Sequence, residues 1–193
     1  QHTLGTANAI ALRFLDFYQP VADRMARTLI ERGFDPERIV KIYNGMEFNR
    51  PEGEFDRAAY LRETYGAEIV EGDVLCGIAA RLTAVKDIAT TVRGFAEALK
   101  TAPQLRLFIA GDGEDADMLK KLCDQLGVRE RVTFCGWVSP VMPFFRAMDI
   151  NLLSSVSETF PYSILEGVCA GCATICSDVG GMPELIDTGE NGY

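Results

Sequence analysis

The chain has 193 residues, of which 48% are apolar, and carries a formal net charge of −9. This length is sufficient for one sizeable hydrophobic core, whereas the acidic balance argues against a nucleic-acid binder, which needs a basic face. No apolar segment approaches the roughly 20 residues of a membrane-spanning helix, and no signal peptide is recognisable. We therefore expect a cytoplasmic domain without a membrane span.

The first 37 residues stand apart from the regular pattern that follows. Apolar spacing predicts a helix over residues 21–32, and Gly33 follows it as a C-terminal capping glycine would. We interpret residues 1–37 as an N-terminal helical or linker segment, which could be the end of a missing N-terminal domain. Residues 44–73 then read as a turn, a loop and one charged helix.

Strand-like and helix-like segments alternate along the rest of the chain. The expected strands are 38–43, 74–80, 105–110, 132–135, 150–153 and 173–176, several of them continuous apolar runs typical of strands buried on both faces. Helical spacing recurs over 88–99, with Asp87 as N-cap, and over 118–126, and Ser139 followed by Pro140 predicts another helix start.

This alternation predicts parallel βαβ units. The expected fold class is α/β, a doubly wound parallel sheet that is Rossmann-like, over residues 38–193. Because the chain ends on a turn signal, Asn191-Gly192, we expect this domain to be truncated at its C-terminus.

Two glutamates carry the strongest functional signal. Glu158 follows the expected strand 150–153, and Glu166 lies in the helix after it. Open α/β sheets bind ligands at the carboxyl edge where such residues gather, and a helix start offers free N–H groups to an anion. Two carboxylates around a helix start suit a sugar joined to a diphosphate.

The cysteines suggest a metal site at first sight. Cys169 and Cys172 form a C-x-x-C pair and Cys176 follows, but the only histidine is His2, at the chain end. Since these cysteines also continue apolar helix and strand patterns, we interpret them as small packed side chains and expect no metal.

Five segments, taken in order, carry a family resemblance: 43–46, 81–87, 110–114, 158–166 and 176–184. Together they resemble the C-terminal, donor-binding domain of GT-B-fold retaining glycosyltransferases, group 1 or family 4. The resemblance implies a nucleoside-diphosphate sugar as donor, metal-independent transfer without a cofactor, and an acceptor held by an N-terminal domain outside this chain. The acceptor is unknown, and parts outside this chain could touch a membrane surface.

The resemblance also implies roles for individual residues. Arg81 and Lys86 would stabilise the leaving diphosphate, since fixed cations there favour the transition state over the ground state. Glu158 would lie near the donor sugar as a third catalytic residue, and Glu166 would accept hydrogen bonds from the ribose hydroxyls. The remaining donor-binding candidates are Phe160, Pro161, Tyr162 and Ser163 at the helix start, Gly111 in a tight turn, and Val138 beside the nucleobase.

Three other interpretations remain to be weighed. A nucleotide-sugar 2-epimerase would share fold and donor but needs further acid–base residues, which we do not identify. A non-catalytic carbohydrate- or protein-interaction module would not need Arg81, Lys86, Glu158 and Glu166 together. A dinucleotide-dependent oxidoreductase lacks its Gly-x-Gly-x-x-Gly helix start.

Overall fold

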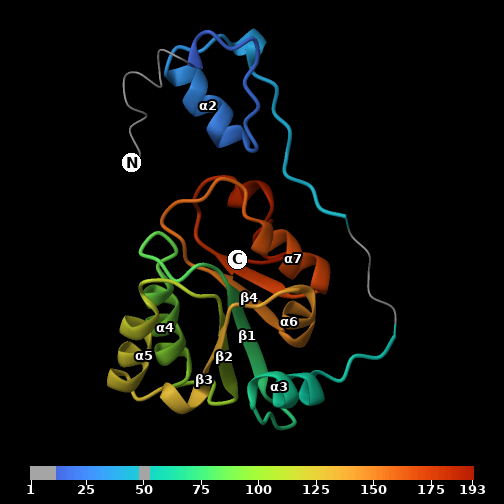
Figure 1. The fold of residues 1–193 in the computed structure, drawn as a ribbon, viewed down its shortest axis with the longest axis vertical. Coiled ribbons are helices and arrows are strands. Elements are labelled where there is room, and N and C mark those ends of the chain that lie inside the picture. Colours follow the sequence, from blue (N-terminus) through green and yellow to red (C-terminus); the bar gives the residue numbers. More distant parts are fainter. Residues whose placement is uncertain (1–11, 48–52) are drawn as a thin grey trace.

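A five-stranded sheet forms the centre of the molecule (Figure 1). The computed structural model describes residues 12–47 and 53–193, so that residues 1–11 of the predicted N-terminal segment and 48–52 of the predicted loop lie outside the described residues. All neighbouring strands pair in parallel, in the order β3-β2-β1-β4-β5. Their bounds are β1 Val74–Ala79, β2 Leu105–Ala110, β3 Val132–Gly136, β4 Ile150–Leu153 and β5 Ala173–Cys176.

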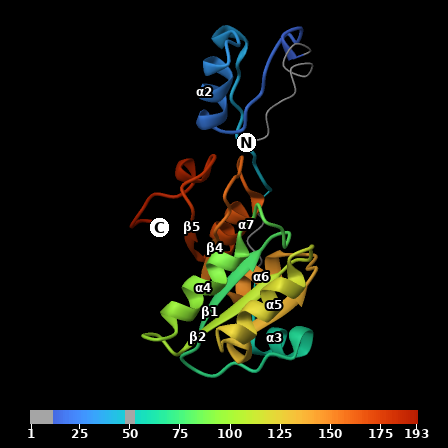
Figure 2. The ribbon, with the colours of Figure 1, turned by 90° about the vertical axis from the view of Figure 1, so that its left-hand side faces the viewer.

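Helices cover both faces of this sheet, as the predicted doubly wound fold requires (Figures 1 and 2). On one face, α4 (Ile88–Ala98) and α5 (Ala116–Gln125) share a core with strand residues such as Ile78 and Ile109. On the other face, α3 (Arg57–Tyr65) and α6 (Met142–Ala147) share a core with Leu75 and Phe108, and α7 (Tyr162–Ala170) contacts α6, β4 and β5. Because side chains alternate along a strand, one apolar run supplies both cores.

The strand order changes side at β1. From β1 the chain adds β2 and then β3 on one side, and it then returns to place β4 on the other side of β1, with Cys76 opposite Ile150. Ligands of open α/β sheets bind at such a switch point, outside the carboxyl ends of the strands. The topology thus fixes where a site is expected.

Residues 12–47, which extend past the predicted end at residue 37 and are called the N-terminal segment from here on, lie beyond the carboxyl end of the sheet (Figure 1). They contain α2 (Asp23–Glu31) and the short helix η1 (Pro36–Arg38). The predicted strand 38–43 is wrong as a member of the sheet: with the described residues, its one ladder pairing is an isolated parallel bridge from Ile39 to Tyr18. Val40, Ile42 and Tyr43 are each about half exposed, so this apolar run is not buried on both faces.

The predicted helix ends are mostly confirmed. Gly33 follows α2 with φ +80°, and the Asp87 side chain accepts from the Thr90 N–H as N-cap of α4. The predicted start at Ser139 and Pro140 is wrong, because α6 begins at Met142 with a different proline, Pro143, in its first turn. In the described ranges, no helix combines the length and apolarity needed to cross a membrane.

Candidate functional site

A cavity of about 330 Å³ opens at the carboxyl edge of the sheet, at the switch point. The ends of β1 and β2, the loops after β3 and β4, and the first two turns of α7 form its wall. The lining residues are Ala79, Ala80, Arg81, Lys86, Ala110, Gly111, Trp137, Val138, Glu158, Pro161, Tyr162, Ser163 and Glu166. This is the place that the topology predicts for a ligand.

A larger hollow, of about 440 Å³, lies between α4 and the ends of β4 and β5. Its lining is apolar apart from a few hydroxyl groups and contains no charged side chain. A diphosphate needs cations or free N–H donors, so the smaller cavity is the candidate site for an anionic ligand.

Glu158 and Lys86 form an ion pair at the cavity wall. The side chain of Glu158 is only 9% exposed and that of Lys86 is 22% exposed. Ser155 Oγ also donates to Glu158 Oε1, at 2.7 Å. The carboxylate is therefore fixed from two sides, and the ammonium is held against it at the cavity. Arg81, by contrast, is exposed and has no carboxylate within ion-pair distance among the described residues.

The start of α7 presents backbone donors to the same cavity. Pro161 occupies the N-cap position, and no acceptor within residues 12–47 or 53–193 bonds the backbone N–H of Tyr162 or Ser163. The buried side chain of Asn151, in β4, donates through Nδ2 to the Ser163 carbonyl at 2.9 Å and ties this turn to the sheet. A helix start with free N–H groups binds anions.

Glu166 lies one turn further along α7 and lines the same cavity. Burial raises the pKa of its carboxyl above the usual value, because a charged group loses solvation there. The carboxylate would regain that lost solvation by accepting two hydrogen bonds from a ligand.

Gly111 allows the ends of β1 and β2 to approach each other at the cavity floor. Its φ is +136°, and a Cβ atom there would lie 1.8 Å from the Ala80 carbonyl oxygen. Any other residue would require the end of β1 to move. The backbone on both sides of the cavity floor is thus set by this glycine.

The structure brings all predicted site residues to this cavity except Phe160. The Phe160 side chain is buried, at 4% exposure, and its ring lies against Tyr43 instead of in the cavity. Sequence reasoning missed Trp137, which lines the cavity and is 75% exposed. It is the chain's single tryptophan and is the neighbour of Val138, a predicted site residue. This position next to Val138 could have indicated from the sequence that Trp137 belongs to the site.

The cysteines do not form a metal centre with the described residues, in which no three His, Cys, Asp or Glu side chains lie close enough to hold an ion. Cys172 is buried in the core with α6, and its thiol donates to the Phe145 carbonyl at 3.2 Å. The packing interpretation is confirmed for Cys172.

Fold and site together define a Rossmann-like α/β domain whose switch-point cavity combines two cations, two carboxylates and a helix start. The model of the family described as glycosyl transferases group 1 matches residues 66–193, and the chain belongs to this family.

Relatives agree with this assignment, and a solved structure agrees with the fold. An uncharacterized glycosyltransferase, MJ1607, of Methanocaldococcus jannaschii is 34% identical over 166 residues, covering 81% of this chain and 41% of the relative. D-inositol 3-phosphate glycosyltransferase of Nocardia farcinica is 30% identical over 220 residues, covering 99% and 48%. The crystal structure of Anabaena HepE in complex with UDP superposes with a TM-score of 0.86 at 24% identity, covering 100% of this chain and 54% of HepE. The chain thus spans about half the length of these proteins.

Proposed function

We propose that this chain is the donor-binding domain of a glycosyltransferase and holds a nucleoside-diphosphate sugar in the switch-point cavity. The observation that carries the proposal is the convergence of Arg81, Lys86, Glu158 and Glu166 on one cavity beside the start of α7. Family membership supports it, as does the binding of UDP by the similarly folded HepE.

The diphosphate would lie between the start of α7 and the cations. The free N–H groups of Tyr162 and Ser163 donate to its oxygens, and the exposed guanidinium of Arg81 provides a bidentate cation. As the glycosidic bond breaks, negative charge grows on the leaving diphosphate, and these fixed groups stabilise it most at that stage.

Lys86 and Glu158 would act as a coupled pair. In the ligand-free cavity the carboxylate neutralises the ammonium, so an arriving diphosphate competes with Glu158 for Lys86. Release of the ammonium toward the phosphate leaves the Glu158 carboxylate available to the donor sugar.

The nucleoside would extend toward Glu166 and Val138. Both ribose hydroxyls can donate to the Glu166 carboxylate, one to each oxygen, and the neighbouring exposed indole of Trp137 offers a face to the base.

The transfer reaction would need more than this chain. We propose that the acceptor is held by an N-terminal domain of the whole protein, and that transfer retains the anomeric configuration without a metal or cofactor. The proposal includes a cytoplasmic location, supported by six cysteines that all carry free thiols.

Calorimetric titration of the chain with UDP, GDP and ADP and with their sugars tests the proposal. We expect at least one nucleotide to bind, and Glu166→Ala to weaken it about 10–100-fold, since up to two hydrogen bonds to a charged acceptor are lost. The matched control is Glu97→Ala, which removes a 73% exposed carboxylate outside the cavity. A folded wild type that binds none of these ligands would refute the proposal and leave the interaction-module interpretation.

A further inference from the structure

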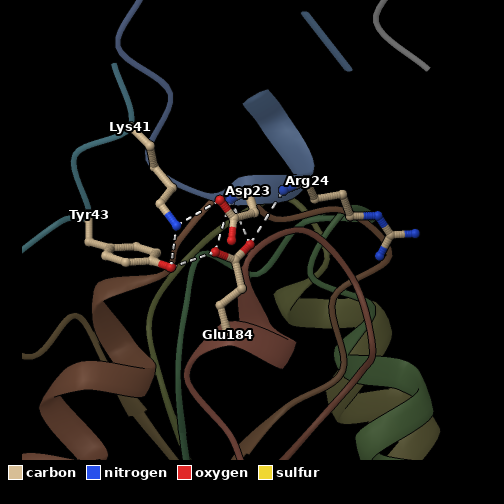
Figure 3. Close-up of polar contacts among 5 residues, drawn as sticks. All are labelled: Asp23, Arg24, Lys41, Tyr43 and Glu184. Atoms are coloured by element: carbon tan, nitrogen blue, oxygen red, sulfur yellow. Dashed lines mark hydrogen bonds and ion pairs between the residues drawn. The ribbon is translucent and has the colours of Figure 1, made fainter. Parts of the chain in front are cut away.

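The N-terminal segment is attached to the donor domain through the carboxylate of Glu184 (Figure 3). This carboxylate accepts from the backbone N–H of Asp23, at 2.8 and 2.9 Å, and of Arg24, at 3.4 Å. Tyr43 Oη also donates to it, at 3.0 Å. The N-cap residue of α2, Ala22, has no side chain to cap the helix, so Glu184 caps it from a distant part of the chain.

Lys41 completes this network on the side of the N-terminal segment. Its ammonium donates to Tyr43 Oη at 2.7 Å and pairs with the Asp23 carboxylate at 2.6 Å (Figure 3). The hydrogen bond to Asp23, followed by that to Tyr43, raises the pKa of Lys41 to about 12. The tyrosine hydroxyl thus stands between a fixed cation and the Glu184 carboxylate.

A second contact reaches the loop that carries Glu158. The ring of Tyr43 lies 5.0 Å from that of Phe160, and Asn44 Nδ2 donates to the Phe160 carbonyl at 2.9 Å. In addition, Gly181 N–H donates to the Thr159 carbonyl at 2.7 Å. Residues 159 and 160 are thus held both by residues 43–44 and by the turn that leads to Glu184.

The loop held in this way is the one that forms the cavity wall. Glu158 lies at its start, and the free N–H groups of Tyr162 and Ser163 follow two and three residues after Phe160. A shift of the Phe160 carbonyl would therefore move the anion-binding donors, whereas Val138 lies on a separate loop after β3. When the binding groups are already held in place before the ligand arrives, ordering them costs less free energy on binding, and the affinity is higher.

We propose that Tyr43, Asn44 and Glu184 are positioning residues for the donor site. They hold the Glu158–Pro161 loop, and with it the start of α7, in the geometry that receives the diphosphate. The inference rests on the proposed function and extends it: residues of the N-terminal segment, none of which lines the cavity, set the affinity for the phosphate part of the donor.

The test compares UDP with uridine, which lacks the diphosphate, in the 193-residue chain. Asn44→Asp keeps the size of the side chain, removes its N–H donor and adds a negative charge. Tyr43→Phe removes only the hydroxyl and adds no charge, so it separates the loss of positioning from an effect of charge. We expect Asn44→Asp to weaken UDP binding about tenfold, the equivalent of one hydrogen bond to a buried acceptor. Uridine affinity, measured by NMR titration, should stay unchanged, and Tyr43→Phe should cause a smaller loss of the same kind.

A control variant and a hydrogen-exchange measurement distinguish a positioning role from a general loss of fold stability. Arg24→Gln is the matched control. It keeps the backbone N–H that bonds Glu184 and changes only an exposed guanidinium, which lies 3.8 Å from the Asp178 carboxylate and 3.4 Å from the Asp178 carbonyl oxygen. This variant should bind UDP as the wild type does. Because coupling between sites is reciprocal, UDP should also slow hydrogen exchange of the Asp23 and Arg24 amides in the wild type, and this slowing should be lost in Glu184→Ala.

The outcomes distinguish the two proposals. If the wild type binds no nucleotide, the proposed function fails, and the positioning role with it. If the wild type binds UDP but folded Asn44→Asp and Tyr43→Phe bind it equally well, or lose UDP and uridine affinity in equal proportion, only the positioning role is overturned.

Discussion

Replacing Glu158 by glutamine removes the negative charge of the cavity ion pair and keeps the shape of that side chain. Glutamine still offers an oxygen to Lys86 and to Ser155, so both hydrogen bonds can persist. The bond from the Lys86 ammonium stays charge-assisted, whereas the bond from Ser155 becomes a neutral one. A hydrogen bond to a charged group contributes roughly 1.5–3 kcal/mol and a neutral one roughly 0.5–1.5 kcal/mol. We therefore expect Glu158→Gln to lose about 1–1.5 kcal/mol, or about 2–6 °C in Tm for a domain of this size.

The same substitution should strengthen binding of UDP. Without the carboxylate charge, Lys86 no longer has to be withdrawn from an ion pair when the diphosphate arrives. If breaking the Lys86–Glu158 pair costs about 1 kcal/mol when UDP binds, a variant without this pair should bind UDP about fivefold more tightly. Stability and affinity thus move in opposite directions, which thermal unfolding and calorimetry measure on one sample.

The surface pair of Lys100 and Glu97 provides the control, because both side chains are more than two-thirds exposed. Lys100→Gln should change stability by less than about 0.5 kcal/mol. An unchanged Tm in Glu158→Gln, or a UDP affinity that falls with it, would refute the competition between Glu158 and the diphosphate for Lys86.

Two further predictions concern the cavity floor and Glu166. Gly111→Ala should destabilise the domain by at least about 2 kcal/mol, whereas Gly94→Ala, within α4 and with open space around its Cβ, should stabilise it by about 0.5–1 kcal/mol; equal Tm values for the two variants would contradict this. Because the folded-state pKa of Glu166 is raised, stability falls as pH rises from its unfolded pKa through the raised one. Glu166→Gln should therefore melt above the wild type at about pH 7 but not at about pH 4. UDP, which prefers the ionised carboxylate, should bind the wild type more weakly as pH falls through the raised pKa; a wild-type affinity that stays flat there in calorimetry would contradict this.

Much of the sheet and the cavity could be predicted from the chain because their signals are local. Apolar runs mark β1 and, after Arg106, most of β2, and Asp87 marks the start of α4. The residues that follow parallel strands must meet at one edge, so Arg81 and Glu158 could be assigned to one site although 77 positions separate them.

The errors concern features that depend on long-range packing. The run 38–43 has strand-like composition, yet its partners are decided by tertiary contacts such as those of Tyr43 with Glu184, 141 positions away. Phe160 was assigned to the site through its backbone N–H, and the sequence does not reveal that its side chain is buried against Tyr43. The pairing of Lys86 with Glu158 was missed for the same reason.

The backbone after β1 and the backbone after β2 approach each other closely, and this determines which positions there tolerate substitution. A Cβ at Gly113, which does not line the cavity, would lie 2.3 Å from the Leu82 carbonyl oxygen, much as one at Gly111 would meet Ala80. Both positions should therefore reject every side chain, although only Gly111 is within reach of a ligand. Because the backbone requires both glycines, both would be preserved equally, so their invariance among variants would report the geometry of the two strand ends and not the chemistry of the donor.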